Sequence, residues 1–128
     1  MRLGRPALAG LLAICAAASA LSAPAAARGE QIYARCMACH ALAYDRVGPR
    51  HCGLFGRRAG SVAGFAYSPA MKSSGITWNE KTLDRFLAAP LKTVPGTTMT
   101  YDGVPDPAER ADLIAYLAQA GRSAECRK

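Results

Sequence analysis

Two cysteines and a histidine stand together in the segment Cys36-Met37-Ala38-Cys39-His40. Two thiols separated by two residues and followed at once by an imidazole are typical of a site where a c-type haem is attached. Each thiol can form a thioether with a vinyl group of the porphyrin, and the adjacent imidazole is then held where it can bind the iron. Two other chemistries use the same cysteine spacing: a redox-active cysteine pair, or part of a zinc site, with a chance histidine beside it.

Residues 1–27 have the layout of a secretory signal peptide. An early pair of arginines is followed by an apolar run over residues 8–21 and by the small residues Ala-Pro-Ala-Ala-Ala, which form a cleavage region. We expect cleavage after Ala27, with Ala25 as the alternative site, and an uncleaved anchor as a second interpretation. The run is short for a transmembrane helix, which needs ~20 apolar residues. Export agrees with haem attachment, which in bacteria takes place outside the cytoplasmic membrane, and permits disulfides.

Residues 28–128 have the length of one small domain with a modest core. The full chain has a formal net charge of +7, and the mature part stays basic because it loses only two arginines with the signal peptide. A basic surface attracts acidic partners or anionic membranes. The basic residues are dispersed and no nucleic-acid motif accompanies them, so we expect no nucleic-acid partner.

Short helices are the elements that must position this chemistry, because no segment shows the alternation of a strand. The predicted helices cover residues 30–39, 68–75, 77–89 and 106–121. Thr77 as N-cap and Glu80 three residues later resemble a capping box, and Pro90 ends that helix. Asp106 as N-cap and Pro107 at the first helical position begin the last helix. Such short helices with long loops make a poor core alone, and they fit a domain wrapped around a flat cofactor.

The sixth position of a haem iron decides its chemistry. An open position binds small molecules, whereas a methionine sulfur closes it and favours electron transfer. The mature chain contains Met37 inside the attachment loop, Met71 on a predicted helix and Met99 in an extended loop after Pro95 and Gly96. Met99 is the candidate ligand, although an isolated methionine in a loop is usually a gap filler.

Beyond the attachment site the chain carries a series of motifs in a fixed order. They are Val47-Gly48-Pro49, Gly53-Leu54-Phe55-Gly56-Arg57, Gly75-Ile76-Thr77-Trp78, Pro95-Gly96-Thr97-Thr98-Met99 and the segment ERADLIAYL at residues 109–117. Over nearly the whole mature chain this series resembles the class I cytochromes c, in the mitochondrial and bacterial c2-like branch. The resemblance implies an all-α cytochrome c fold, with short helices and long loops wrapped around one covalently bound haem c.

The resemblance also implies what each site residue does. Cys36 and Cys39 hold the haem, His40 and Met99 bind its iron on opposite sides, and no residue is catalytic. The carbonyl of Pro49 accepts the second ring N–H of the histidine, which fixes the ring. A buried propionate needs polar partners, and the matching side chains are Arg57, Tyr67, Trp78 and Thr97. The alternatives are a solvated surface charge for the arginine and ordinary core packing for the tryptophan.

Several positions depart from the family. Met71 and Phe86 stand where relatives often carry asparagine and tyrosine, so we expect few buried waters there and an Fe–Met99 bond that resists alkali. Relatives ring the exposed haem edge with lysines. Arg35 and Arg46 keep charge at two such positions, and the following do not: Leu91, Thr98, Pro105 and Asp106. We therefore expect a weaker charged ring and a shallow salt dependence of electron transfer.

Cys52 and Cys126 are cysteines that the family rarely has. The family fold brings the loop after Pro49 near the end of the chain, so we expect a disulfide between them, with two free thiols as the alternative. His51 stands where relatives are usually apolar, and we expect it to be exposed or hydrogen-bonded rather than a third iron ligand. Gly29 matches the close contact between the first and last helices.

The function implied by the resemblance is that of a monomeric periplasmic electron carrier that transforms no substrate. The expected partners are redox proteins with acidic docking faces: a cytochrome bc1-type complex, a terminal oxidase, a reaction centre or a dehydrogenase, in a respiratory or photosynthetic chain. One alternative is a dedicated acceptor subunit of a single periplasmic dehydrogenase. A further alternative is a haem enzyme or sensor whose sixth ligand can be displaced.

Overall fold

The computed structural model of the protein describes residues 1, 4 and 23–128. The apolar run of the expected signal peptide, including Cys15, lies outside the described residues. Among the helices that are described, none has the length and apolarity needed to cross a membrane.

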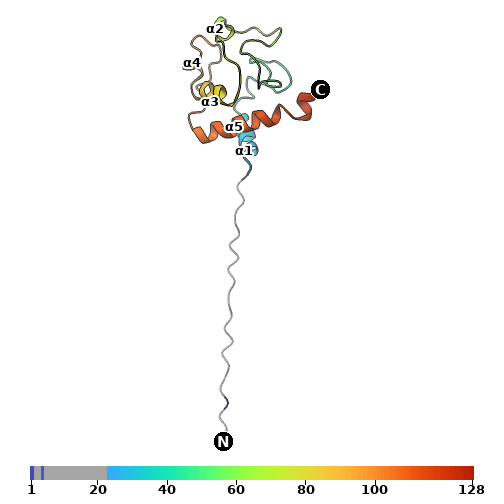
Figure 1. The fold of residues 1–128 in the computed structure, drawn as a ribbon, viewed down its shortest axis with the longest axis vertical. Coiled ribbons are helices and arrows are strands. Elements are labelled where there is room, and N and C mark those ends of the chain that lie inside the picture. Colours follow the sequence, from blue (N-terminus) through green and yellow to red (C-terminus); the bar gives the residue numbers. More distant parts are fainter. Residues whose placement is uncertain (2–3, 5–22) are drawn as a thin grey trace.

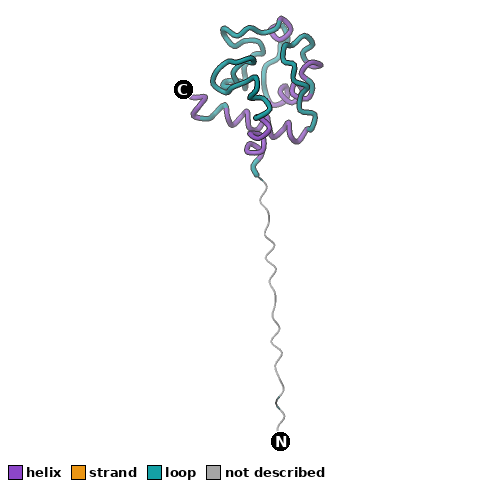
Figure 2. Tube along the Cα trace, turned by 180° about the vertical axis from the view of Figure 1, so that it is seen from behind, coloured by secondary structure: helices purple, strands orange, loops and turns teal. Residues whose placement is uncertain are grey.

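Short helices and long loops make up the described chain (Figures 1 and 2). The helices are α1 (Ala25–Tyr33), α2 (Pro69–Lys72), α3 (Glu80–Ala88), α4 (Pro90–Thr93), α5 (Pro107–Ala120) and a final 3-10 turn, η1 (Ala124–Arg127). Within residues 23–128 there is no strand, and an isolated antiparallel bridge joins Arg58 to Thr77. The predicted all-α class is confirmed.

Helices α1 and α5 cross in direct contact at the base of the molecule (Figure 1). Gly29 permits this approach, because a Cβ atom there would lie 1.9 Å from the Asp112 carbonyl oxygen and 2.8 Å from the Tyr116 Cβ. The Arg28 guanidinium donates two hydrogen bonds to the Asp112 carboxylate, at 2.7 and 2.8 Å, beside the crossing. The close contact expected for Gly29 is therefore present.

The core lies where α3 and α5 meet the loops. Leu83, Phe86 and Leu87 form the buried face of α3, as their spacing predicts, and Leu113 of α5 is completely buried. Arg110 is also buried: it donates to the carbonyls of Val104 and Pro105, at 3.0 and 2.9 Å, and to Asp84 Oδ1 at 2.9 Å. This side chain therefore ties the start of α5 to α3 and to the loop before α5.

Two predicted helix starts have different outcomes. Asp106 caps α5, accepting from the Ala108 N–H at 3.1 Å, with Pro107 in the first position, as predicted. The predicted N-cap of α3 is wrong by two residues, because Asn79 forms the capping box with Thr82. The physical reason lies in the preceding backbone, where Trp78 exchanges hydrogen bonds with Arg57 and Gly56 and is held extended.

The predicted helix over residues 30–39 is also wrong in its bounds. Helix α1 begins five residues earlier, at Ala25, and ends at Tyr33, and residues 34–39 form tight turns instead. The Cys36 N–H donates to the Tyr33 carbonyl at 2.8 Å, and the Cys39 N–H to the Cys36 carbonyl at 3.1 Å. These turns place Cys36 in a half-buried position and leave Cys39 exposed.

Candidate functional site

A single cavity brings together the residues that the sequence singled out. Cys36, Cys39, His40 and Met99 all line it. So do Pro49 and the four expected propionate partners: Arg57, Tyr67, Trp78 and Thr97. Of the other two mature methionines, Met71 lines the cavity and Met37 is exposed outside it.

The state of the cysteines distinguishes the possible chemistries of the attachment motif. Both Cys36 and Cys39 have free thiols. Burial raises the pKa of the Cys36 thiol to about 11, whereas a redox-active cysteine pair depends on a thiolate with a lowered pKa. No three His, Cys, Asp or Glu side chains converge as a metal-ion site in the described part of the chain. The geometry therefore favours thioether formation over redox or zinc chemistry.

His40 presents one ring nitrogen to the cavity. Its Nδ1 lies 2.8 Å from the Pro49 carbonyl oxygen, which can only accept, so Nδ1 carries the proton and Nε2 has a free lone pair. Burial lowers the pKa of His40, which keeps the ring neutral, as a metal ligand must be. Gly48 leaves room for the ring, because a Cβ there would lie 2.3 Å from its Cε1 atom.

The loop after α4 carries Met99. Val94 is buried and its carbonyl accepts from the Thr97 N–H at 3.0 Å, which turns the loop at Gly96. The Thr97 hydroxyl, also buried, accepts from the Met99 N–H at 3.3 Å. These bonds hold a thioether on the wall of the cavity, which two buried apolar side chains, Met71 and Phe86, also line.

Residues with polar donor groups also line this cavity. The Arg57 guanidinium donates to the carbonyls of Arg50 and Cys52, at 2.9 and 3.2 Å, and still has unused N–H groups of its five. The Tyr67 hydroxyl accepts from the Val62 N–H at 3.2 Å, which leaves its own O–H free to donate. Trp78 is buried with its ring centroid 5.0 Å from that of Phe86. Arg57 is thus half-buried and bonded, not a solvated surface charge.

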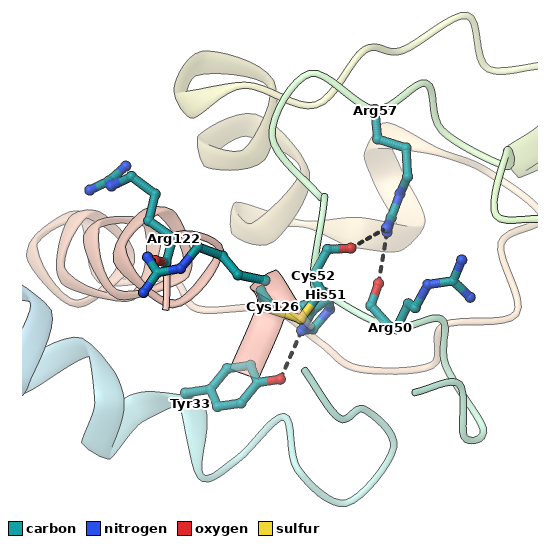
Figure 3. Close-up of a disulfide and its surroundings, with 8 residues drawn as sticks. Tyr33, Arg50, His51, Cys52, Arg57, Arg122 and Cys126 are labelled. Carbon is teal, nitrogen blue, oxygen red and sulfur yellow. Dashed lines mark hydrogen bonds between the residues drawn. A yellow bond between two sulfur atoms is a disulfide. The ribbon is translucent and has the colours of Figure 1, made fainter. Parts of the chain in front are cut away.

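A disulfide joins Cys52 to Cys126, with the two Cα atoms 5.2 Å apart (Figure 3). Cys52 follows the Pro49 loop and Cys126 lies on η1, beyond the end of α5. The bond therefore fastens the chain terminus to the wall that holds His40.

One contact was not predicted from the sequence. The ring of His51 stacks on the ring of His40, with centroids 4.2 Å apart and planes inclined by 20°. The expectation that His51 is hydrogen-bonded is met by the Tyr33 hydroxyl, 2.9 Å from its Nδ1. A histidine at a usually apolar position was the available signal, but its packing partner depended on the fold.

The residues present fit a haem. Two free thiols stand on one cavity wall, a neutral imidazole offers a nitrogen, and a methionine offers a sulfur. Arginine, tyrosine and threonine groups beside them supply donors for carboxylates, and buried apolar side chains fill the remaining wall. This donor set matches a porphyrin with thioether links, two axial ligands and charged propionates.

Comparison with known proteins leads to the same family. The model of the Cytochrome c family matches residues 26–121. Cytochrome c2 of Blastochloris viridis is 43% identical over 113 residues, covering 86% of this chain and 89% of the relative. Cytochrome c2 of Rhodomicrobium vannielii is 47% identical over 104 residues, covering 79% and 83%.

A solved structure agrees with these relatives. Cytochrome cH from Methylobacterium extorquens superposes with a TM-score of 0.72 at 45% identity, covering 73% of this chain and 97% of that one. Because the family match spans most of the chain and the relatives exceed 40% identity, this chain belongs to the cytochrome c family, in its class I c2-like branch, and carries one covalently bound haem c.

Proposed function

We propose that this cytochrome c carries single electrons between redox proteins, with His40 and Met99 as the axial ligands of its iron. The bound haem supplies a one-electron couple, ferric and ferrous iron. The observation that carries the proposal is that Cys36, Cys39, His40 and Met99 line one cavity. The similarity to proteins named cytochrome c2 supports the same function.

His40 serves as the first ligand through Nε2, since Nδ1 is occupied by the Pro49 carbonyl. That hydrogen bond fixes the tautomer and makes the imidazole a stronger donor. The neutral state favoured by burial leaves no proton to be displaced when the nitrogen binds metal.

Met99 serves as the second ligand, and we propose that the closed iron transforms no substrate. An enzyme that handles peroxide or oxygen needs distal hydrogen-bond donors beside an open position. Here Met71 and Phe86, which line the same cavity as Met99, are both buried and apolar. Their lack of polar groups disfavours water beside the sulfur and supports electron transfer over catalysis.

The haem propionates are the groups we assign to Arg57, Tyr67, Trp78 and Thr97. A carboxylate taken out of water is costly unless it is hydrogen-bonded. Arg57 brings a positive charge, because even a pKa lowered by burial leaves a guanidinium protonated. Tyr67 and Thr97, whose hydroxyls can donate hydrogen bonds, line the same cavity.

The partners we propose are redox proteins that dock where the cavity opens. Arg35, Cys39 and Val47 are exposed and also line the cavity, so they mark its mouth. Arg35 is paired with Glu109 through two bonds of 3.1 Å, which offsets its charge. Val47 is 79% exposed. Such a mouth supports docking on apolar contacts with limited steering by charge, onto a partner that is mildly acidic.

Salt dependence tests this docking proposal. Electron transfer to one terminal oxidase is measured from low to high ionic strength, with a lysine-ringed mitochondrial cytochrome c as the comparator. We expect the rate to fall less steeply with salt for this chain, because rim charges mainly set the association rate. An equally steep fall for both proteins would contradict the proposal.

The compartment we propose is the periplasm, reached by means of the N-terminal segment. Cleavage after Ala27 leaves Arg28 as the first residue, whose ion pair with Asp112 holds the start of the chain on α5. Mass spectrometry of the protein from a periplasmic fraction tests both points. A mass that includes residues 1–27, or recovery in the membrane fraction, would show an anchor instead.

Replacing Met99 tests the central assignment of the electron carrier. We expect ferric Met99→Ala to lose the weak far-red band of sulfur-bound iron, and the reduced variant to bind carbon monoxide at neutral pH. Met71→Ala is the matched control, because Met71 is buried and lines the same cavity. The Met71→Ala variant should keep the far-red band and should not bind carbon monoxide at neutral pH. The assignment fails if the two variants exchange these behaviours, or if Met99→Ala behaves as the parent protein does.

A further inference from the structure

His51 packs on the ring that we assign to the iron. The centroids of His51 and His40 are 4.2 Å apart and the planes are inclined by 20°, which is a stacked arrangement. Both rings line the haem cavity. A branched aliphatic side chain could fill similar space, but it has no flat face to lie parallel to the imidazole of His40.

Tyr33 fixes the rotation of His51. Its hydroxyl shares a 2.9 Å hydrogen bond with His51 Nδ1, and the two rings meet edge to face with centroids 5.6 Å apart. Tyr33 is itself 3% exposed and packs against Tyr116 of α5, at a centroid distance of 5.0 Å. Tyr33 on α1 is held in place by its packing on α5, and its hydroxyl in turn holds the ring of His51 in one orientation.

The backbone around His51 is anchored as well (Figure 3). Its N–H donates to the carbonyls of Ala41 and Leu42, at 3.2 and 3.1 Å, in the segment that follows His40. On either side of it, Arg57 donates to the carbonyls of Arg50 and Cys52. Cys52 is also held by the disulfide to Cys126. The stacked ring therefore projects from a segment that is fastened to three other parts of the chain.

The contacts of His51 are packing and one side-chain hydrogen bond: its ring lies on His40, and its Nδ1 is bonded to the Tyr33 hydroxyl. Together, His51 and Tyr33 provide His40 with a flat neighbouring ring that is held at a fixed angle.

We propose that His51 is a positioning residue that sets the plane of the His40 imidazole relative to the haem. The hydrogen bond to Pro49 fixes the tautomer of His40 and restrains its ring at Nδ1, but a hydrogen bond tolerates a range of angles, so rotation of the ring about the Cβ–Cγ bond is only partly restricted. A parallel neighbour restricts the twist, and Tyr33 prevents the neighbour from turning. The proposal rests on the proposed function, in which His40 binds the iron.

Paramagnetic NMR of the ferric holoprotein tests this, because the spread of the haem methyl resonances follows the plane of the axial ligands. His51→Leu removes the flat face and Tyr33→Phe removes only the hydroxyl that orients it. Tyr116→Phe is the matched control, since Tyr116 packs on Tyr33 and its hydroxyl takes no part in the Tyr33–His51 hydrogen bond. We expect a changed methyl pattern in His51→Leu, a smaller change in Tyr33→Phe, and the parent pattern in Tyr116→Phe.

Thermal unfolding of the same variants separates positioning from packing. A lower Tm with the parent methyl pattern in His51→Leu means that the ring only fills space, and overturns the proposal. If His51→Leu does not fold, the Tyr33→Phe variant is the test, and the parent haem methyl pattern in that variant also overturns the proposal. Failure of the ligand assignment looks different, because the parent protein would then lack the shifted methyl resonances of low-spin ferric haem.

Discussion

The disulfide between Cys52 and Cys126 is removed in the double variant Cys52→Ser/Cys126→Ser. The two cysteines are 74 positions apart, so their bond closes most of the domain into one loop. The haem thioethers do not duplicate this constraint, because Cys36 and Cys39 lie outside the loop and close only a short one. The double variant therefore increases the conformational entropy of the unfolded chain by a large amount.

The expected loss follows from the length of the loop. Loop-closure entropy for about 75 residues corresponds to about 4 kcal/mol of unfolding free energy at 25 °C. For a domain of about 100 residues this lowers Tm on the order of 20 °C. The unlinked unfolded chain is also more expanded, so the dependence of the free energy on denaturant should become steeper.

Guanidinium unfolding followed by far-UV circular dichroism measures this loss. The iron is kept ferric throughout, because a thiol reductant would change the haem together with the disulfide. The single variants Cys52→Ser and Cys126→Ser are the controls. Each breaks the same disulfide, so each should lower the free energy of unfolding by about as much as the double variant does. A loss under about 1 kcal/mol, or single costs that add up in the double variant, would refute the reasoning.

Three further perturbations have definite outcomes. Gly48→Ala places a Cβ 2.3 Å from the His40 ring, so we expect an altered haem spectrum, which optical spectroscopy measures. Arg110→Met leaves two backbone carbonyls without their donor, and urea unfolding should show a loss of about 2–3 kcal/mol. His51 has its pKa lowered to about 3 in the folded state, against about 6.5 when unfolded. Between about pH 3 and about pH 6.5 the unfolded state takes up this proton and the folded state does not, so stability falls with decreasing pH by up to about 1.4 kcal/mol per unit. Unfolding free energies of His51→Leu across pH 4–7 should lack this component.

Local signals predicted the elements that depend on local chemistry. Asp106 and Pro107 specify the start of α5 because the cap and the fixed proline torsion act within one turn. The cap of α3 was misplaced because Thr77 and Trp78 are held extended by pairing with residues 56–58, a contact between segments about 20 residues apart. The start of α1 carries no polar cap, which left its bounds without a local signal.

The residues of the candidate site also divide into those that the local sequence predicts and those that depend on the folded structure. The residues Cys36, Cys39 and His40 were predicted from their spacing alone, since the chemistry requires them to be adjacent. Met99 was selected from three methionines with the help of the family resemblance. The stacking of His51 on His40 was not predicted, because it depends on how the loop beyond Pro49 folds back over the ring. Contacts between loops have no periodic pattern in the sequence from which they could be inferred.

X-ray absorption at the iron edge tests the central claim most directly, since it identifies the atoms bound to the metal. For the ferric holoprotein at neutral pH we predict one sulfur scatterer, from Met99, beside the nitrogens of the porphyrin and of His40. The Met99→Ala variant should lose the sulfur and keep the nitrogens. An iron shell of nitrogen and oxygen alone in the parent protein would contradict the account.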